Sequence, residues 1–310
     1  AWLTGFTGSA GTAVVLKDRA AIFVDGRYTL QAENQINLEQ YEIVSIGETS
    51  IDSWMKNNVH EGQNIAFDPK LHTRTAIKSL QKICASKGAQ MVSLQKNPLD
   101  SIWIGQPPPP ISPAIPHKKI YAGMSLKDKC DKIAANISEK GADAVVITMT
   151  DSIAWLLNLR GGDVEFTPLP LSFAILHKDA SAELFIDKRK MNADTVSHLG
   201  NRVSIHSKDD FAGSLNSLRN KSIKIQIDPS TASEWVYQQA LGGTSTILEA
   251  TDPCSLPKAI KNTTELSGSK AAHLRDGAAL TKFLHWLSET SLEGSLTELE
   301  ASDKLEEYRQ

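Results

Sequence analysis

Short apolar runs alternate with helical patterns along the whole chain. Ala13–Leu16 and Ala21–Asp25 flank a polar Lys17-Asp18-Arg19, which is typical of a hairpin. In 73–87 the apolar residues recur at helical spacing. By the same criteria, strands are predicted at 41–46, 63–67, 91–94, 144–149, 171–176, 182–187, 203–205, 223–227 and 246–248, and helices at 28–36, 50–57, 126–137, 153–159, 209–218 and 232–241. This alternation predicts an α/β fold.

The pattern occurs twice, in the same order. The matches are Ala1-Trp2-Leu3 with Ala154-Trp155-Leu156, Ala21–Arg27 with Glu183–Arg189, Val44-Ser45-Ile46 with Val203-Ser204-Ile205, and Ile65–Pro69 with Ile225–Pro229. Their offsets lie between about 153 and 162 residues. A repeat of this length predicts two similar α/β domains in tandem, the first copy and the second copy.

A proline-rich segment separates the copies. Gln106 precedes four consecutive prolines, and Pro113 and Pro116 follow. Proline lacks the amide donor and fixes φ, so this segment predicts a stiff, extended linker. A proline-rich ligand for a partner domain is the alternative interpretation.

The two copies differ at their beginnings. The second copy has a predicted helix and strand, Ser125–Met149, before its Ala-Trp-Leu motif, whereas the first copy begins at that motif. We therefore expect that the chain lacks the start of its first domain, because the missing strand would leave a sheet edge open. Asn262–Gln310 contains two amphipathic helices without a following strand, and we expect it to open a third domain.

Composition narrows the possible functions. The chain has 310 residues, 41% of them apolar, and a net charge of −3, so nothing favours nucleic acid or an anionic membrane as a partner. No apolar run reaches the roughly 18 residues of a membrane span, and no secretory leader is visible. Cys84, Cys130 and Cys254 are far apart, which favours free thiols in a reducing compartment.

Most motifs that could indicate a binding or catalytic site have low specificity in this sequence. Gly5, Gly8 and Gly11 precede a strand rather than a helix, so they predict a tight turn and not a phosphate loop. Ser9 is not in a nucleophile elbow. The eight histidines form no metal-binding motif and are interpreted as surface or packing residues.

Two turns carry an arginine. In Asp25-Gly26-Arg27-Tyr28 the arginine follows a strand end, where a guanidinium group often grips a carboxylate or carbonyl oxygen. On composition alone, an ion pair with Asp25 or a neighbouring residue is the favoured interpretation. Arg160–Asp163 is interpreted as the charged exit of a helix.

Together these motifs resemble a known family. The residues that carry the resemblance are Leu3–Thr12 (LTGFTGSAGT), Val24–Gln31 (VDGRYTLQ), Asp151–Asp163 (DSIAWLLNLRGGD), Lys258–Asn262 (KAIKN) and Ala271–Asp276 (AAHLRD). They look like the three-domain form of aminopeptidase P, the Xaa-Pro aminopeptidases of peptidase family M24. The resemblance runs nearly from end to end.

The resemblance implies an architecture and a reaction. It implies two creatinase-like N-terminal domains with mixed sheets flanked by helices, at 1–105 and 117–257 around the linker 106–116, and the incomplete start of a pita-bread catalytic domain at 258–310. Such enzymes remove the N-terminal residue from short peptides with proline second. They use two divalent metal ions, usually Mn²⁺, to activate water.

The resemblance places little of that chemistry in this chain. The metal ligands would lie beyond Gln310, so no catalytic or metal-binding residue is assigned, and the chain alone is expected to be inactive. Arg27 is the one expected substrate contact. A cytoplasmic homodimeric enzyme is implied, with no nucleic-acid or membrane partner. The alternatives are a non-catalytic peptide- or histone-binding module and a creatinase-like amidinohydrolase, which typically has only one N-terminal domain.

Overall fold

The computed structural model describes residues 1–291 and 294–310, which form two compact units. Unit 1 comprises residues 1–110 and 210–251, and unit 2 comprises residues 111–209 and 252–310. Unit 1 therefore contains the first copy together with the last part of the second copy.

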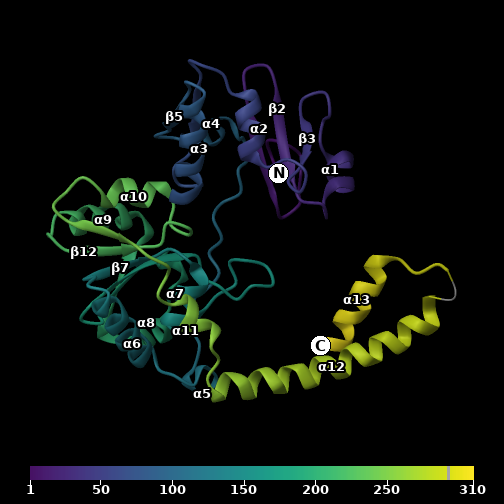
Figure 1. Ribbon diagram of the computed structural model, residues 1–310. Coiled ribbons are helices and arrows are strands. Elements are labelled where there is room, and N and C mark those ends of the chain that lie inside the picture. The colour runs from purple at the N-terminus through teal and green to yellow at the C-terminus, as the bar shows by residue number, and fades with distance from the viewer. Residues whose placement is uncertain (292–293) are drawn as a thin grey trace. The chain divides into compact units, whose positions relative to one another are not determined.

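Unit 1 contains three groups of paired strands (Figure 1). Strand β2 pairs with β1 in antiparallel and with β3 in parallel orientation, while β4–β5 and β12–β13 are parallel pairs. The elements are β1 (Gly11–Val15), β2 (Ala20–Val24), α1 (Thr29–Gln35), β3 (Glu42–Ser45), α2 (Ile51–Asn58), β4 (Asn64–Phe67), α3 (Arg74–Ser86), β5 (Gln90–Ser93), α4 (Pro98–Ile102), α9 (Phe211–Arg219), β12 (Lys224–Ile227), α10 (Glu234–Ala240) and β13 (Thr246–Glu249).

Strand β2 is buried on both faces. Ala21 and Phe23 pack against residues of α2 and α3, including Trp54. The alternate residues of β2, Ile22 and Val24, pack with Phe6 and with residues of α1 on the opposite face. Because side chains alternate along a strand, helices on both faces require the continuous apolar run that β2 shows.

Unit 2 is built on the sheet β11-β10-β9-β7. Strand β10 is parallel to β11 and antiparallel to β9, and β9 is antiparallel to β7. The elements are β6 (Ile115–Pro116), α5 (Lys119–Ala122), α6 (Leu126–Glu139), β7 (Ala144–Ile147), α7 (Thr150–Leu156), β8 (Leu159–Arg160), β9 (Ser172–His177), β10 (Ala182–Ile186), η1 (Lys188–Lys190), α8 (Ala193–Leu199), η2 (Gly200–Arg202), β11 (Val203–Ser207), α11 (Ser255–Ala259), α12 (Thr263–Thr290) and α13 (Glu298–Arg309). A short turn, η3 (Lys208–Asp210), leads into α9.

The predicted α/β fold and its duplication are confirmed. Strands β1-β2-β3 have the same order and directions as β9-β10-β11, and the parallel pair β4–β5 has its counterpart in β12–β13. The second copy adds α6 and β7, with β7 beside β9. The equivalent edge, on β1, pairs with no strand among the described residues.

Helix α7 corrects one prediction. It begins at Thr150 and ends at Leu156, three residues before the predicted end at Leu159. Asn158 then takes a positive φ of 50°, and its side-chain amide donates to the Met124 carbonyl oxygen at 2.9 Å. This left-handed residue ends the helix, so Leu159 and Arg160 extend into β8 instead.

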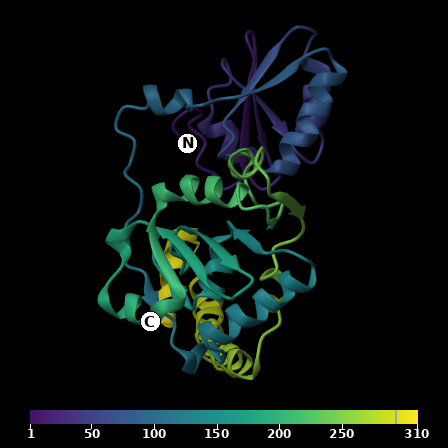
Figure 2. The same ribbon diagram turned by 90° about the vertical axis from the view of Figure 1, so that its left-hand side faces the viewer.

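The C-terminal segment forms a helical hairpin. Asn262 and Glu265 make a capping box at the start of α12. The sequence Ser295-Leu-Thr-Glu298 predicts a capping box for α13, but the box is formed two residues later, by Thr297 and Glu300. Helix α13 lies beside α12 in both views (Figures 1 and 2), and Arg309 donates to Asp276 at 2.8 Å.

The three cysteines are free and buried, which confirms that part of their interpretation. Burial raises the pKa of the Cys130 thiol to about 12. No described helix is both long and apolar enough to cross a membrane.

Candidate functional site

Arg27 follows the end of β2, as predicted, and lies in a tight turn. Its backbone N–H donates to Asp25 Oδ1 at 2.9 Å. Its guanidinium group returns to the same carboxylate, with Nε at 3.1 Å from Oδ1 and Nη2 at 2.5 Å from Oδ2. The Arg27 side chain is 74% exposed. Nη1 makes no hydrogen bond within the part of the chain that the structure describes.

The Tyr28 ring packs against the Arg27 guanidinium group, and the glycine-rich turn packs against Tyr28. Its guanidinium carbon lies 5.3 Å from the centroid of the Tyr28 ring, and the Tyr28 hydroxyl is 2.6 Å from the Ser9 hydroxyl. Tyr28 packs edge-on against Phe6. A Cβ at Gly8 would lie 2.2 Å from the Phe6 ring, so the glycine is needed for close approach. The glycines therefore build a turn, as predicted.

The electrostatics of this turn are local. Hydrogen bonds from the side chain and backbone of Arg27 lower the pKa of Asp25, and the carboxylate in turn raises the pKa of Arg27. The ion pair that composition favours is therefore present, with Asp25 as the partner.

The second copy repeats this turn. Arg189 donates from its backbone N–H and from Nε to Asp187 Oδ1, both at 3.0 Å, and from Nη2 to Oδ2 at 2.6 Å. The recurrence shows that the Asp-x-Arg sequence itself produces the arrangement. The middle residue differs, being Gly26 in the first copy and Lys188 in the second. The residue after the arginine differs too: it is Tyr28 in the first copy and the buried Lys190 in the second.

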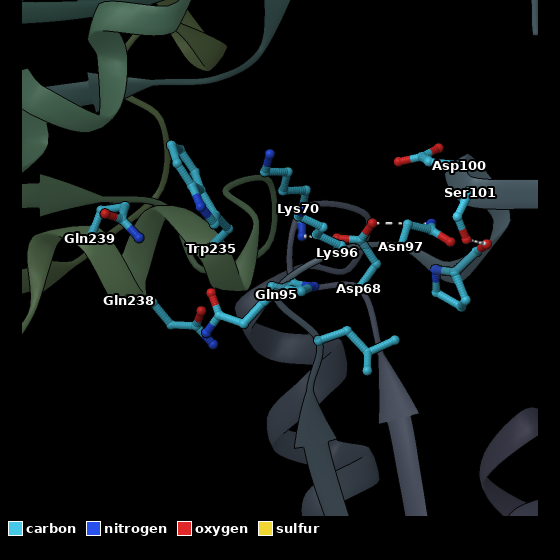
Figure 3. A pocket seen from close by; sticks show the side chains of 13 residues that line it. Asp68, Lys70, Gln95, Lys96, Asn97, Asp100, Ser101, Trp235, Gln238 and Gln239 are labelled. Carbon is cyan, nitrogen blue, oxygen red and sulfur yellow. Dashed lines mark hydrogen bonds between the residues drawn. The ribbon is translucent and has the colours of Figure 1, made fainter.

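A polar cavity of about 520 Å³ lies elsewhere in unit 1 (Figure 3). Its lining residues are Asp68, Pro69, Lys70, Leu94, Gln95, Lys96, Asn97, Pro98, Asp100, Ser101, Trp235, Gln238 and Gln239. Lys70 Nζ lies 5.6 Å from the centroid of the Trp235 ring, and Asn97 donates to Asp68 at 3.1 Å. Arg27 is not among the lining residues, so the predicted contact and this cavity are separate features.

The cavity lining suits binding better than bond cleavage. It offers two ammonium groups, two carboxylates, a hydroxyl group, amides and an indole ring, but neither histidine nor cysteine. Sequence reasoning missed it because its two sides lie more than a hundred residues apart. The repeated Asp-Pro at 68 and 228 was the only available signal.

The histidines do not form a metal centre in the described part of the chain. Within residues 1–291 and 294–310, no group of three or more His, Cys, Asp or Glu side chains could hold a metal ion. The residues present do not fit a di-metal centre, and we assign no catalytic step to a metal here.

Sequence reasoning also missed a buried lysine. Lys129 Nζ donates to Asn158 Oδ1 at 2.8 Å and to the Trp155 carbonyl oxygen at 3.0 Å. The ammonium group lies 4.4 Å from the centroid of the Trp155 ring. Burial lowers the pKa of Lys129 to about 8.

This lysine predicts a pH dependence of stability. Its folded-state pKa lies below the roughly 10.4 of an unfolded lysine. The unfolded chain therefore binds more protons between these values, and the free energy of unfolding should rise from about pH 8 to about pH 10. Urea unfolding across this range should show the rise in the wild type and a smaller one in Lys129→Met. If the free energy of unfolding rises equally with pH in the wild type and in Lys129→Met, the pH dependence does not come from Lys129.

The Arg160–Asp163 turn is more buried than predicted. The Asp163 carboxylate is fully buried and pairs with Lys190 Nζ, itself 3% exposed. Asp163 also accepts from the backbone N–H groups of Leu171 at 2.7 Å and Ser112 at 3.2 Å. The turn therefore has a structural role, but as the centre of a buried network rather than as a charged exit.

Comparison with known proteins assigns the fold of both copies. The family model described as the creatinase/prolidase N-terminal domain matches residues 1–101, and a second model of the same description matches residues 105–265.

Curated relatives match the chain along its whole length. A probable Xaa-Pro aminopeptidase P of Paracoccidioides brasiliensis (strain Pb03) is 35% identical over 325 residues, covering 99% of this chain and 52% of the relative. Aminopeptidase P2 of Arabidopsis thaliana is 35% identical over 343 residues, covering 100% and 48%. The chain thus spans about half the length of the curated relatives it matches.

A solved structure agrees with these relatives. The crystal structure of X-prolyl aminopeptidase from Caenorhabditis elegans, described as a cytosolic enzyme with a di-nuclear active site, has a TM-score of 0.91 and 29% identity. The match covers 99% of this chain and 51% of that one. The chain is homologous to Xaa-Pro aminopeptidase P and belongs to the creatinase/prolidase N-terminal domain family.

Proposed function

We propose that this chain is the N-terminal part of a metal-dependent Xaa-Pro aminopeptidase, which releases the first residue from short peptides with proline in second position. The observation that carries the proposal is the end-to-end match to proteins of that name, at 35% identity over 99% of the chain. The C. elegans structure supports it independently with a TM-score of 0.91.

The reacting centre would lie outside this chain. We propose two divalent metal ions, Mn²⁺ in identity, held by residues beyond Gln310. The di-nuclear site described for the C. elegans enzyme supports the number of ions. Such ions would supply the Lewis-acid chemistry that activates water for peptide hydrolysis.

The described domains would then shape access to that centre. We propose that the chain consists of the first copy at 1–105, the linker at 106–116, the second copy at 117–257 and the start of the catalytic domain at 258–310. The family matches at 1–101 and 105–265 support the division into two copies. We further propose that the two copies form the walls of the entrance to the active site and contribute to the contacts of a homodimer. We also propose that the protein is cytosolic like its C. elegans relative.

Arg27 is the proposed point of substrate contact. Its exposed guanidinium group, with Nη1 directed to no described partner, can donate to a peptide carboxylate or carbonyl oxygen. Asp25 and Tyr28 would hold the planar group in position for that contact.

Metal removal tests the proposal on the complete protein. A chelator should abolish release of the N-terminal residue from an Xaa-Pro peptide, and Mn²⁺ should restore it. The 310-residue chain should show neither activity nor restoration. Metal-independent cleavage, or cleavage by this chain alone, would contradict the proposal. Tight peptide binding by a complete protein that has no hydrolytic activity would instead favour the binding-module alternative.

A further inference from the structure

Equivalent loops of the two copies meet in unit 1. The loops follow β4 and β12, and they begin with Asp68-Pro69 and Asp228-Pro229, which are 160 residues apart. Lys70 N–H donates to Asp68 Oδ1 at 2.8 Å, and Ser230 N–H donates to Asp228 Oδ1 at 2.8 Å. Each loop ends at the cap of a helix, α3 or α10. The two loops are therefore structural equivalents.

The backbone contacts between these loops come in reciprocal pairs. Thr75 N–H donates to the Pro229 carbonyl oxygen at 3.0 Å, and Trp235 N–H donates to the Pro69 carbonyl oxygen at 2.8 Å. Thr75 and Trp235 are equivalent residues of the two copies, 160 positions apart, and so are Pro69 and Pro229. The two bonds therefore join the same two positions in opposite senses.

A second reciprocal pair lies closer to the centre. Arg74 N–H donates to the Ala232 carbonyl oxygen at 3.2 Å, and Glu234 N–H donates to the His72 carbonyl oxygen at 2.8 Å. Between the two bonds of this second pair, Thr73 and its equivalent Ser233 form an antiparallel bridge. A contact in which i meets j and j meets i is isologous, with a local two-fold axis at this bridge.

Side chains extend the same symmetry. Lys78, on α3, donates to Glu249 at the end of β13 at 2.7 Å. Gln238, the equivalent residue of α10, donates to Ser93 at the end of β5 at 3.1 Å. The surface is therefore self-complementary in backbone and in side-chain position, and it does not by itself distinguish one copy from the other.

One pair of side chains breaks the symmetry. Arg74 Nη1 lies 2.7 Å and 2.8 Å from the two carboxylate oxygens of Glu234, its own equivalent in the second copy. The two side chains are only 22% and 7% exposed. The Arg74 guanidinium carbon also lies 5.1 Å from the centroid of the Tyr237 ring. If two first copies met in this way, arginine would face arginine. If two second copies met, glutamate would face glutamate.

We propose that Arg74 and Glu234 make this self-complementary surface selective, so that a first copy pairs with a second copy and not with another copy of its own kind. Like charges brought together in a desolvated contact oppose association, whereas opposite charges favour it. The same surface can then join two chains if one chain carries glutamate at both positions 74 and 234 and the other carries arginine at both. The partner of such a chain is a second copy of this chain with the complementary charge.

Charge reversal in the 310-residue chain tests the proposal. Arg74→Glu places two glutamates across the axis, and Glu234→Arg places two arginines there. The double variant Arg74→Glu/Glu234→Arg restores an opposite pair. We expect both single variants to melt at lower temperature than the wild type, and the double variant to recover most of the loss.

Co-expression tests the choice of partner. Two differently tagged chains, one Arg74→Glu and one Glu234→Arg, should exchange copies and co-purify as a 1:1 pair. We expect about tenfold more co-purification than for two wild-type chains or for two chains with the same single variant. The matched control is Lys78→Glu with Glu249→Lys, a pair on the same surface that is 44% and 40% exposed, which should change co-purification little.

Two results would overturn the proposal. One is a double variant that melts as low as the single variants. The other is complementary co-purification no higher than that of the like-charged pairs. If both single variants fail to fold, the double variant decides: recovery of the wild-type melting temperature supports the proposal, and failure to recover it overturns it.

Discussion

Replacing Asp163 with asparagine should lower the free energy of unfolding by about 3–5 kcal/mol. The substitution keeps the size of the side chain but leaves Lys190, which is 3% exposed, without its counter-charge. Lys190→Met should cost a similar amount, because it leaves the fully buried carboxylate without a cation. The double variant Asp163→Asn/Lys190→Met should cost less than the sum of the two, since neither charge is then left alone.

Urea unfolding followed by circular dichroism measures these differences. The matched control is Lys178→Met, which removes the lysine of an exposed pair whose Lys178 Nζ to Asp143 Oδ1 distance is 2.7 Å. Exposed pairs contribute little, so this variant should unfold close to the wild type. If Asp163→Asn unfolds as close to the wild type as Lys178→Met, the buried network does not stabilise unit 2 as argued.

Replacing Arg27 with alanine in the complete protein should reduce kcat/KM for Xaa-Pro peptides by about ten- to hundredfold. The reason is the loss of charge-assisted hydrogen bonds from an exposed guanidinium group to the bound peptide. The melting temperature should hardly change, because the side chain is 74% exposed. Steady-state kinetics on a peptide with proline in second position provides the measurement.

The second copy supplies the control for this prediction. Arg189 has the same bonds to Asp187 in the same kind of turn, so Arg189→Ala removes the same interaction at the equivalent position. We expect its kcat/KM to remain at the wild-type value. Equal losses for the two variants would assign both turns a structural role, and an unchanged kcat/KM for Arg27→Ala would remove it from the substrate site.

The sequence was informative where local pattern decides the structure. The apolar run of β2, the glycine turn around Phe6 and the capping box at Asn262 follow from neighbouring residues alone. The duplication was visible because equivalent strands keep the same short sequences. The alternating pattern and the duplication predicted the fold class and where most strands lie along the chain.

Contacts between distant residues were not predictable in this way. Asp163 and Lys190 are 27 residues apart, and neither neighbourhood indicates that both side chains are buried. Asn158 ends α7 through a bond to Met124, 34 residues away. The cavity beside Trp235 and the Arg74–Glu234 pair likewise need the two loops to be brought together. The role of Arg27 rests on resemblance, because its visible bonds are those of a local turn.

The selectivity of the complete protein for proline tests the central claim most directly. Two peptides that differ only in proline or alanine at the second position would be incubated with it, and the products identified by mass spectrometry. We predict loss of one N-terminal residue from the proline peptide and none from the alanine peptide. Equal cleavage of both peptides, or cleavage of neither, would contradict it.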